Sequence, residues 1–146
     1  MRRGLRVLMM GVGLAVFTLA GATGAAAQEA AKPVLTLEGD AAMITVLIKP
    51  DKTADFEAML TKYREALEKS DKAERKQQAA GLKFYKSSQQ AQGNAIYLII
   101  ADPVVKDQEY DFTRIINEVF PSEIQEIFAK YKEAFAGRAI AAITKK

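Results

Sequence analysis

A continuous amphipathic stretch from Phe112 to Phe135 limits what this chain can fold into. Its apolar residues recur every three or four positions, which is the spacing of one helix face. A face of this length has to be buried, so shorter apolar runs elsewhere in the chain must supply the surface that covers it. The pattern consists of Phe112, Ile115, Ile116, Val119, Phe120, Ile124, Ile127, Phe128, Tyr131 and Phe135.

Pro121 divides this stretch into two predicted helices. On one straight helix, the apolar residues before Pro121 and those after it would point roughly 110° apart, toward different neighbours. Proline breaks a helix interior but is well tolerated in a first turn, and Ser122 with Gln125 has the spacing of a capping box. We therefore expect a break at 120–121 that turns both apolar stripes to one core. Gly137 is a typical helix stop.

Residues 1–27 predict a cleaved Sec-type signal peptide. A basic start at 1–6 is followed by an apolar run at 7–20, which is too short for a comfortable membrane span. The small residues at 25–27 form an A-x-A cleavage site, so cleavage is expected after Ala27 and the mature chain begins at Gln28. We expect a periplasmic or secreted protein with no membrane span after cleavage. The alternative, an uncleaved anchor, stays open.

The charge balance argues against a nucleic-acid partner. The full chain has 21 Lys and Arg against 18 Asp and Glu, but Arg2, Arg3 and Arg6 lie in the predicted leader. Without these three, 18 basic residues balance 18 acidic ones, which is not the basic surface that nucleic acid requires. The charge-rich run at 68–76 alternates in sign, which is typical of a solvated helix face.

The remaining periodicities predict one α+β domain over residues 42–146. It follows an N-terminal tail at 28–41, in which 34–37 has the pattern of a short strand. β-Branched residues predict a strand at 42–49, and apolar positions three and four apart predict a helix at 53–69. The other predicted elements are helical turns at 71–78, strands at 82–88 and 95–101, and a closing edge strand at 139–144.

The element order is β-α-β-β-α with a closing β, the split βαβ or ferredoxin-like arrangement. In this order and in its element lengths, 42–144 resembles the dimeric α+β barrel superfamily of antibiotic-biosynthesis-monooxygenase-like domains. The segments AAGLKFY at 79–85 and DPVV at 102–105 look like those of an uncharacterised family of exported bacterial proteins. The resemblance implies an antiparallel sheet with helices on one face, and a homodimer.

The residue types that are missing exclude several chemistries. The chain contains no histidine, cysteine or tryptophan, which removes His-based triads, thiol catalysis and ordinary zinc or haem ligation. Enzymes of the resembling superfamily commonly use His, Trp or Asn in the pocket, and of that set only Asn94 and Asn117 are present. We can name no catalytic residue. We expect no cofactor, and a non-catalytic role in preference to an enzymatic one.

Four acidic residues have part of the spacing of a calcium-binding loop. They occupy positions 1, 3, 5 and 12 of such a loop, but Phe112 stands where the loop requires glycine. Acids gathered before a helix are favoured by the helix dipole without any metal. We therefore expect no metal site. The four residues are Asp107, Glu109, Asp111 and Glu118.

Two candidate sites follow from the predicted fold. A small apolar ligand would enter a pocket between sheet and helices, lined by Tyr63, Phe84, Phe112 and Ile116. Because alternate strand residues face opposite sides, we place Ile44, Val46 and Ile48 under the helices together with Ile96, Leu98 and Ile100. The predicted homodimer face is then formed by Met43, Thr45, Leu47, Tyr85, Tyr97 and Ile99.

These features favour an exported, non-catalytic domain that binds a small ligand or serves as an accessory module. Two alternatives stay open. One is a cofactor-independent monooxygenase-like or isomerase-like enzyme that acts on a small aromatic or lipophilic substrate. The other is a structural partner in an envelope complex.

Overall fold

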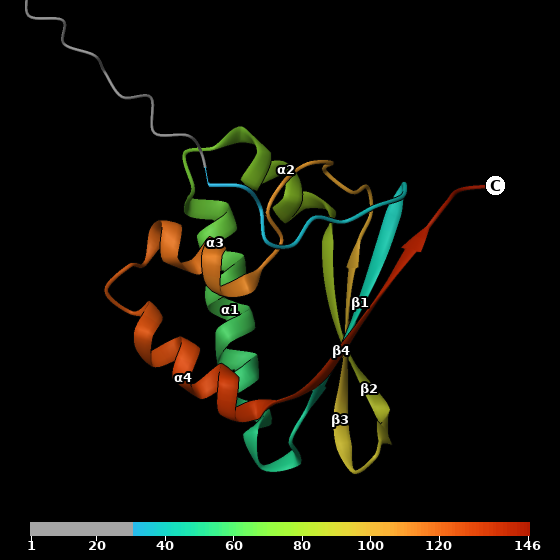
Figure 1. Ribbon diagram of the computed structural model, residues 1–146, viewed down its shortest axis with the longest axis vertical. Coiled ribbons are helices and arrows are strands. Elements are labelled where there is room, and N and C mark those ends of the chain that lie inside the picture. Colours follow the sequence, from blue (N-terminus) through green and yellow to red (C-terminus); the bar gives the residue numbers. More distant parts are fainter. Residues whose placement is uncertain (1–30) are drawn as a thin grey trace, which may run out of the picture. The chain divides into compact units, whose positions relative to one another are not determined.

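The computed structural model describes residues 31–146, which form an α+β domain (Figure 1). The predicted signal peptide and its cleavage site lie outside the described residues. Between β1 and α1 the chain makes a short 3-10 helix at Pro50–Lys52. The elements are β1 (Ala41–Ile48), α1 (Thr53–Lys69), α2 (Ala73–Gly81), β2 (Leu82–Ala91), β3 (Asn94–Ala101), α3 (Phe112–Val119), α4 (Ile124–Ala134) and β4 (Phe135–Ile143).

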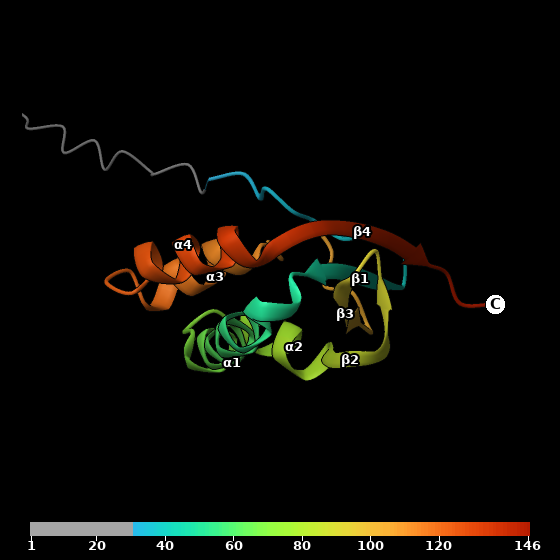
Figure 2. The same cartoon turned by 90° about the horizontal axis from the view of Figure 1, so that it is seen from below.

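The four strands form one antiparallel sheet in the order β2-β3-β1-β4. The helices lie on one side of this sheet, as Figures 1 and 2 show from two directions. Strands β2 and β3 are joined by a tight turn in which Gln92 and Gly93 both have positive φ, 54° and 76°. Such a turn matches the twist of the two strands that it connects.

The core lies between the sheet and the helices. Along β1, Ile44, Val46 and Ile48 are buried, as the alternation in the sequence predicts. Helix α1 covers them with a stripe that includes Phe56 and Tyr63, and its bounds are those predicted. Fully burying one such large side chain stabilises the fold by about 1.5–3 kcal/mol. This shared core is what holds the sheet against the helices.

The amphipathic stretch is broken into α3 and α4, which confirms the predicted helix break. The details around the break differ from the prediction. The cap residue of α4 is Glu123 and has no side-chain cap, so Ser122 and Gln125 form no capping box. Helix α4 ends at Ala134, and Gly137 lies inside β4, because the chain turns directly into the sheet rather than into a loop.

The segment before β1 is not a strand, although the sequence pattern of 34–37 suggested one. Its backbone is instead held by the α3 side of the domain: the Val34 and Leu35 N–H groups donate to the Glu109 carboxylate at 2.7 and 3.0 Å. Leu37 follows and is buried in the core. Within residues 31–146, no helix has the length and apolar character to span a membrane.

Candidate interaction surface

One face of the sheet is not covered by any helix of the described residues, and we call it the open face. Residues directly opposite in an antiparallel ladder share a face. Met43 pairs with Ile100, Thr45 with Leu98 and Leu47 with Ile96, while Tyr85 pairs with Leu98 on the next strand. By the same register, Lys83 lies opposite Ile100, and Gly137, Ala139 and Ala141 of β4 lie opposite Leu47, Thr45 and Met43. The open face therefore includes Met43, Thr45, Leu47, Lys83, Tyr85, Ile96, Leu98 and Ile100, with Gly137, Ala139 and Ala141 along β4.

The open face is apolar at the centre of the sheet. Its β1 and β3 residues are half-buried by one another, and Tyr85 is 49% exposed. An antiparallel sheet that keeps one face in water normally places polar side chains there. Among Met43, Thr45, Leu47, Ile96, Leu98 and Ile100 of the central strands, only Thr45 is polar, and the Lys83 ammonium and Tyr85 hydroxyl belong to the edge strand β2. This departure makes the open face the candidate interaction surface of the domain.

Four of the predicted dimer-face residues lie on the open face, namely Met43, Thr45, Leu47 and Tyr85. The placement of the other two is wrong. Tyr97 and Ile99 are 3% and 1% exposed, and they lie opposite Val46 and Ile44 beneath the helices.

The error is a shift of one residue along β3. Ile96, Leu98 and Ile100, which we had expected under the helices, are on the open face instead. Both faces of β3 are apolar, so the pattern of that strand does not fix which face is buried, and a slip of one position exchanges the two. The uninterrupted run AIYLIIA is itself the signal that neither face of β3 is meant for water.

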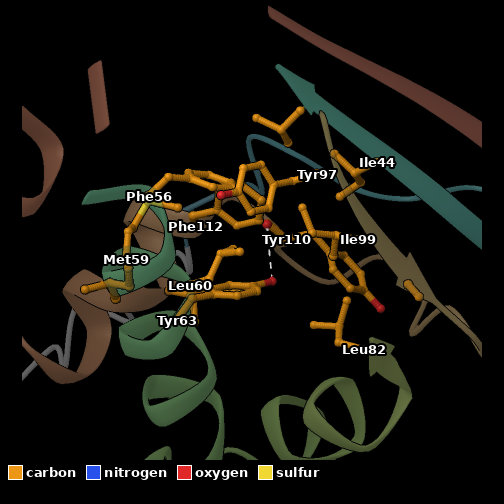
Figure 3. Close-up of a cluster of buried hydrophobic side chains, with 14 of the residues drawn as sticks. Ile44, Phe56, Met59, Leu60, Tyr63, Leu82, Tyr97, Ile99, Tyr110 and Phe112 are labelled. Atoms are coloured by element: carbon orange, nitrogen blue, oxygen red, sulfur yellow. Dashed lines mark hydrogen bonds between the residues drawn. The ribbon is translucent and has the colours of Figure 1, made fainter. Parts of the chain in front are cut away.

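The predicted pocket residues come together, but they form part of the packed core. The Tyr63 ring lies 5.0 Å from that of Phe112 and 6.1 Å from that of Phe84, edge to face in both pairs. Ile116 is fully buried nearby in the same cluster. Figure 3 shows Tyr63 and Phe112 within the cluster, and the Tyr63 hydroxyl donating to the Tyr110 carbonyl at 3.4 Å. Burial raises the pKa of the Tyr63 hydroxyl, so it stays protonated.

The surface hollows of the domain lie elsewhere. One hollow, about 510 Å³, is lined by the end of α2 and by the loop after β3, with Ala80, Gly81 and Val104 among its residues. Another, about 230 Å³, lies between α1 and α4, where Met59 and Ile127 are surrounded by charged side chains. Neither hollow includes any of the four predicted pocket residues.

One polar cluster connects the sheet to α1. The Tyr97 hydroxyl donates to Glu57 Oε1 at 2.6 Å, and Lys86 Nζ donates to the same oxygen at 2.9 Å. The Lys86 and Tyr97 hydrogen bonds lower the pKa of Glu57, while burial raises the pKa of Tyr97. The cluster fits a role in fastening α1 to β2 and β3.

A second polar cluster is buried between α2 and α3. Arg75 is 3% exposed, which corrects the expectation that the whole run at 68–76 is solvated. Its guanidinium binds both Glu118 oxygens, at 3.0 and 2.8 Å, and donates to Gln78 Oε1 at 2.8 Å. Gln78 in turn donates to the Glu109 carbonyl at 2.8 Å. The sequence gives no sign of this cluster, since its members lie up to 43 residues apart.

Three of the four carboxylates with calcium-like spacing have separate partners. Glu109 accepts from backbone N–H groups, the Asp111 side chain caps α3 by accepting from the Arg114 N–H, and Glu118 binds Arg75. In the part of the chain that the structure describes, no three metal-ligating side chains gather into one cluster.

The fold and its surfaces were compared with known proteins. No family model, curated protein or solved structure matches this chain.

Proposed function

We propose that this chain is an exported, non-catalytic accessory domain that works as a homodimer, with the open faces of two copies packed against each other. The observation that carries the proposal is the apolar open face itself. A contiguous apolar patch on a monomer rarely exceeds a few hundred Å², and larger patches mark contact surfaces. Export is inferred from the leader sequence.

A second copy is a suitable cover for this face. In a two-fold dimer the same patch serves both subunits, so one contact removes two apolar faces from water. Two sheets pack about 10 Å apart when their side chains interdigitate. The open face offers branched side chains such as Leu47, Leu98 and Ile100 at its centre, and its charged residue Lys83 lies on the edge strand β2.

The strand order supports the ferredoxin-like assignment and, with it, the resemblance to dimeric α+β barrels. Read from β4, the order is β4-β1-β3-β2, with a helical connection between β1 and β2 and another between β3 and β4. This is the arrangement that the split βαβ motif requires when it is repeated. In the resembling superfamily such sheets pair in dimers, which is the assembly proposed here.

The test is to replace Leu47 and Leu98 together with Glu and to measure mass by light scattering. We expect the open-face contact to be lost, because four carboxylates would meet across the two-fold axis and lose water. A matched control changes Gln77 and Gln125 to Glu, which adds the same charge at exposed helix positions. A folded Leu47→Glu, Leu98→Glu protein with the wild-type mass would refute the open-face homodimer.

A further inference from the structure

The sheet has two edges, and they differ in how well they are protected. Exposed strand edges in natural proteins carry lysine, proline or bulges that discourage pairing with another chain. Strand β2 has such features: Lys83 and Lys86 are exposed, and its register with β3 shifts between Lys86 and Gln90. Strand β4 contains neither lysine nor proline, and Arg138 is its only charged residue. Its one register shift with β1 lies at its start, between Phe135 and Gly137, and the rest of the strand is regular.

Exposed hydrophobic residues concentrate at the β4 edge. Of the six large hydrophobic side chains that are exposed within residues 31–146, Phe135, Ile140 and Ile143 lie on β4 and Phe128 lies on the preceding helix α4. Ile140 alone is 43% exposed. Figure 2 shows β4 as the outermost strand, with its far side turned away from β1.

The backbone of β4 can be assigned group by group. The Ile143 carbonyl accepts from the Asp40 N–H at 3.0 Å, so the polar backbone groups of Ile143 point toward the β1 side. In an antiparallel ladder, neighbouring residues point these groups to opposite sides. The register with β1 is regular from Ile143 back to Gly137. The outward N–H and C=O groups of β4 are therefore those of Ala142, Ile140 and Arg138.

We propose that the outer edge of β4 pairs antiparallel with β4 of a second copy around a two-fold axis at Ile140, which gives a continuous sheet across two subunits. With this axis, Ile140 exchanges both backbone hydrogen bonds with Ile140 of the partner subunit. Arg138 then lies opposite Ala142 of the partner subunit, so no two like charges face each other. The exposed Ile140 side chains meet on the helix side of the joined sheet.

This contact does not depend on the open-face dimer, because it uses backbone groups of β4 rather than side chains of β1, β2 and β3. Two different isologous contacts on one chain close into a tetramer when their axes are perpendicular. We therefore expect a tetramer if both contacts form, and a dimer if only the edge contact forms.

Ile140→Pro tests the edge contact. The substitution removes an outward N–H and leaves the ladder with β1 intact. Proline is tolerated on an edge strand at such positions, where the lost N–H would face away from the sheet. The control is Ile140→Val, which keeps the N–H and the branched side chain. We expect Ile140→Pro to halve the mass measured by analytical ultracentrifugation, and Ile140→Val to keep the wild-type mass. If the Ile140→Pro protein no longer melts cooperatively, the same mass measurement is made on Ile140→Lys. A lysine on an edge strand discourages pairing with another chain and leaves the backbone N–H in place.

Combining the variants separates the two contacts. The Leu47→Glu, Leu98→Glu protein should keep an edge dimer, and adding Ile140→Pro or Ile140→Lys should give a monomer. A folded edge variant with the same mass as its parent would overturn the edge contact, as would a monomeric wild-type protein. If Leu47→Glu with Leu98→Glu leaves the mass unchanged while the edge variant halves it, the open-face contact is wrong and the edge contact stands.

Discussion

The Val34 N–H donates to Glu109 Oε2 at 2.7 Å across 75 residues of sequence. The same carboxylate accepts from the Leu35 and Asp111 N–H groups, and the Leu35 carbonyl accepts from the Tyr110 N–H at 2.7 Å. Glu109 is only 6% exposed. One buried carboxylate thus fixes the N-terminal segment to the start of α3, and the segment belongs to the folded domain.

Glu109→Gln should weaken this attachment. The amide keeps the shape, but its NH2 group must face N–H donors, which leaves buried donors unsatisfied at a cost of about 1–3 kcal/mol. Urea unfolding should show a lower free energy of unfolding, and limited proteolysis should cut near Val34 faster than in the wild type. Glu133→Gln, which alters an exposed ion pair with Lys52, is the control. Equal stability and equal cleavage rates in both variants would contradict this role.

Glu118 should make stability depend on acidity. Burial raises the pKa of Glu118, but hydrogen bonds from Arg75 and Lys72 outweigh it and hold the pKa below the ordinary value of 4.5. Because the folded pKa is the lower one, the stabilisation is present above pH 4.5 and is lost as pH falls through the folded pKa. The melting temperature of wild type should therefore exceed that of Glu118→Gln near neutral pH and approach it in acid. Glu68→Gln, at an exposed position of α1, is the matched control. A difference between wild type and Glu118→Gln that stays constant with pH would refute the idea.

Ile99 and Leu98 are neighbours in sequence and should respond differently to truncation. Ile99→Ala removes a side chain from the core beneath the helices, so we expect a loss of about 2–5 kcal/mol in stability with no change in mass. Leu98→Ala acts on the open face and should lower stability less while it weakens self-association. Chemical unfolding and sedimentation on the same samples measure both effects. Reversed effects of the two substitutions would mean that the β3 faces are exchanged.

The predicted leader gives a direct chemical test. Protein recovered from the periplasm or the medium should have the intact mass of a chain that begins at Gln28. An Ala25→Asp, Ala27→Asp variant should retain the leader, because the cleavage site requires small residues. Wild-type protein that still carries 1–27 would instead support the uncleaved anchor.

Local periodicity was sufficient to predict most elements of the fold. Helix α1 has the predicted bounds, and the break between α3 and α4 lies next to Pro121 because proline cannot continue a helix. Strand β4 was predicted to begin at 139 but begins at Phe135, since its pairing with β1 outweighs the helical pattern of the preceding residues.

The sites were harder to predict than the elements. The face of β3 depends on its register with β1, and a strand with two apolar faces leaves that register open. The burial of Arg75 depends on Glu118 and Gln78, which lie on two different helices. Sequence spacing describes contacts within one helix or strand, and these contacts connect separate elements.

The beginning of β1 and the end of β4 are fastened at one corner of the sheet: the Asp40 N–H donates to the Ile143 carbonyl, and the Lys145 N–H donates to Asp40 Oδ2 at 2.9 Å. Ladder hydrogen bonds lie perpendicular to antiparallel strands. A pulling force between Asp40 and Lys145 therefore acts along these bonds and opens them one after another, so the domain unzips under low tension.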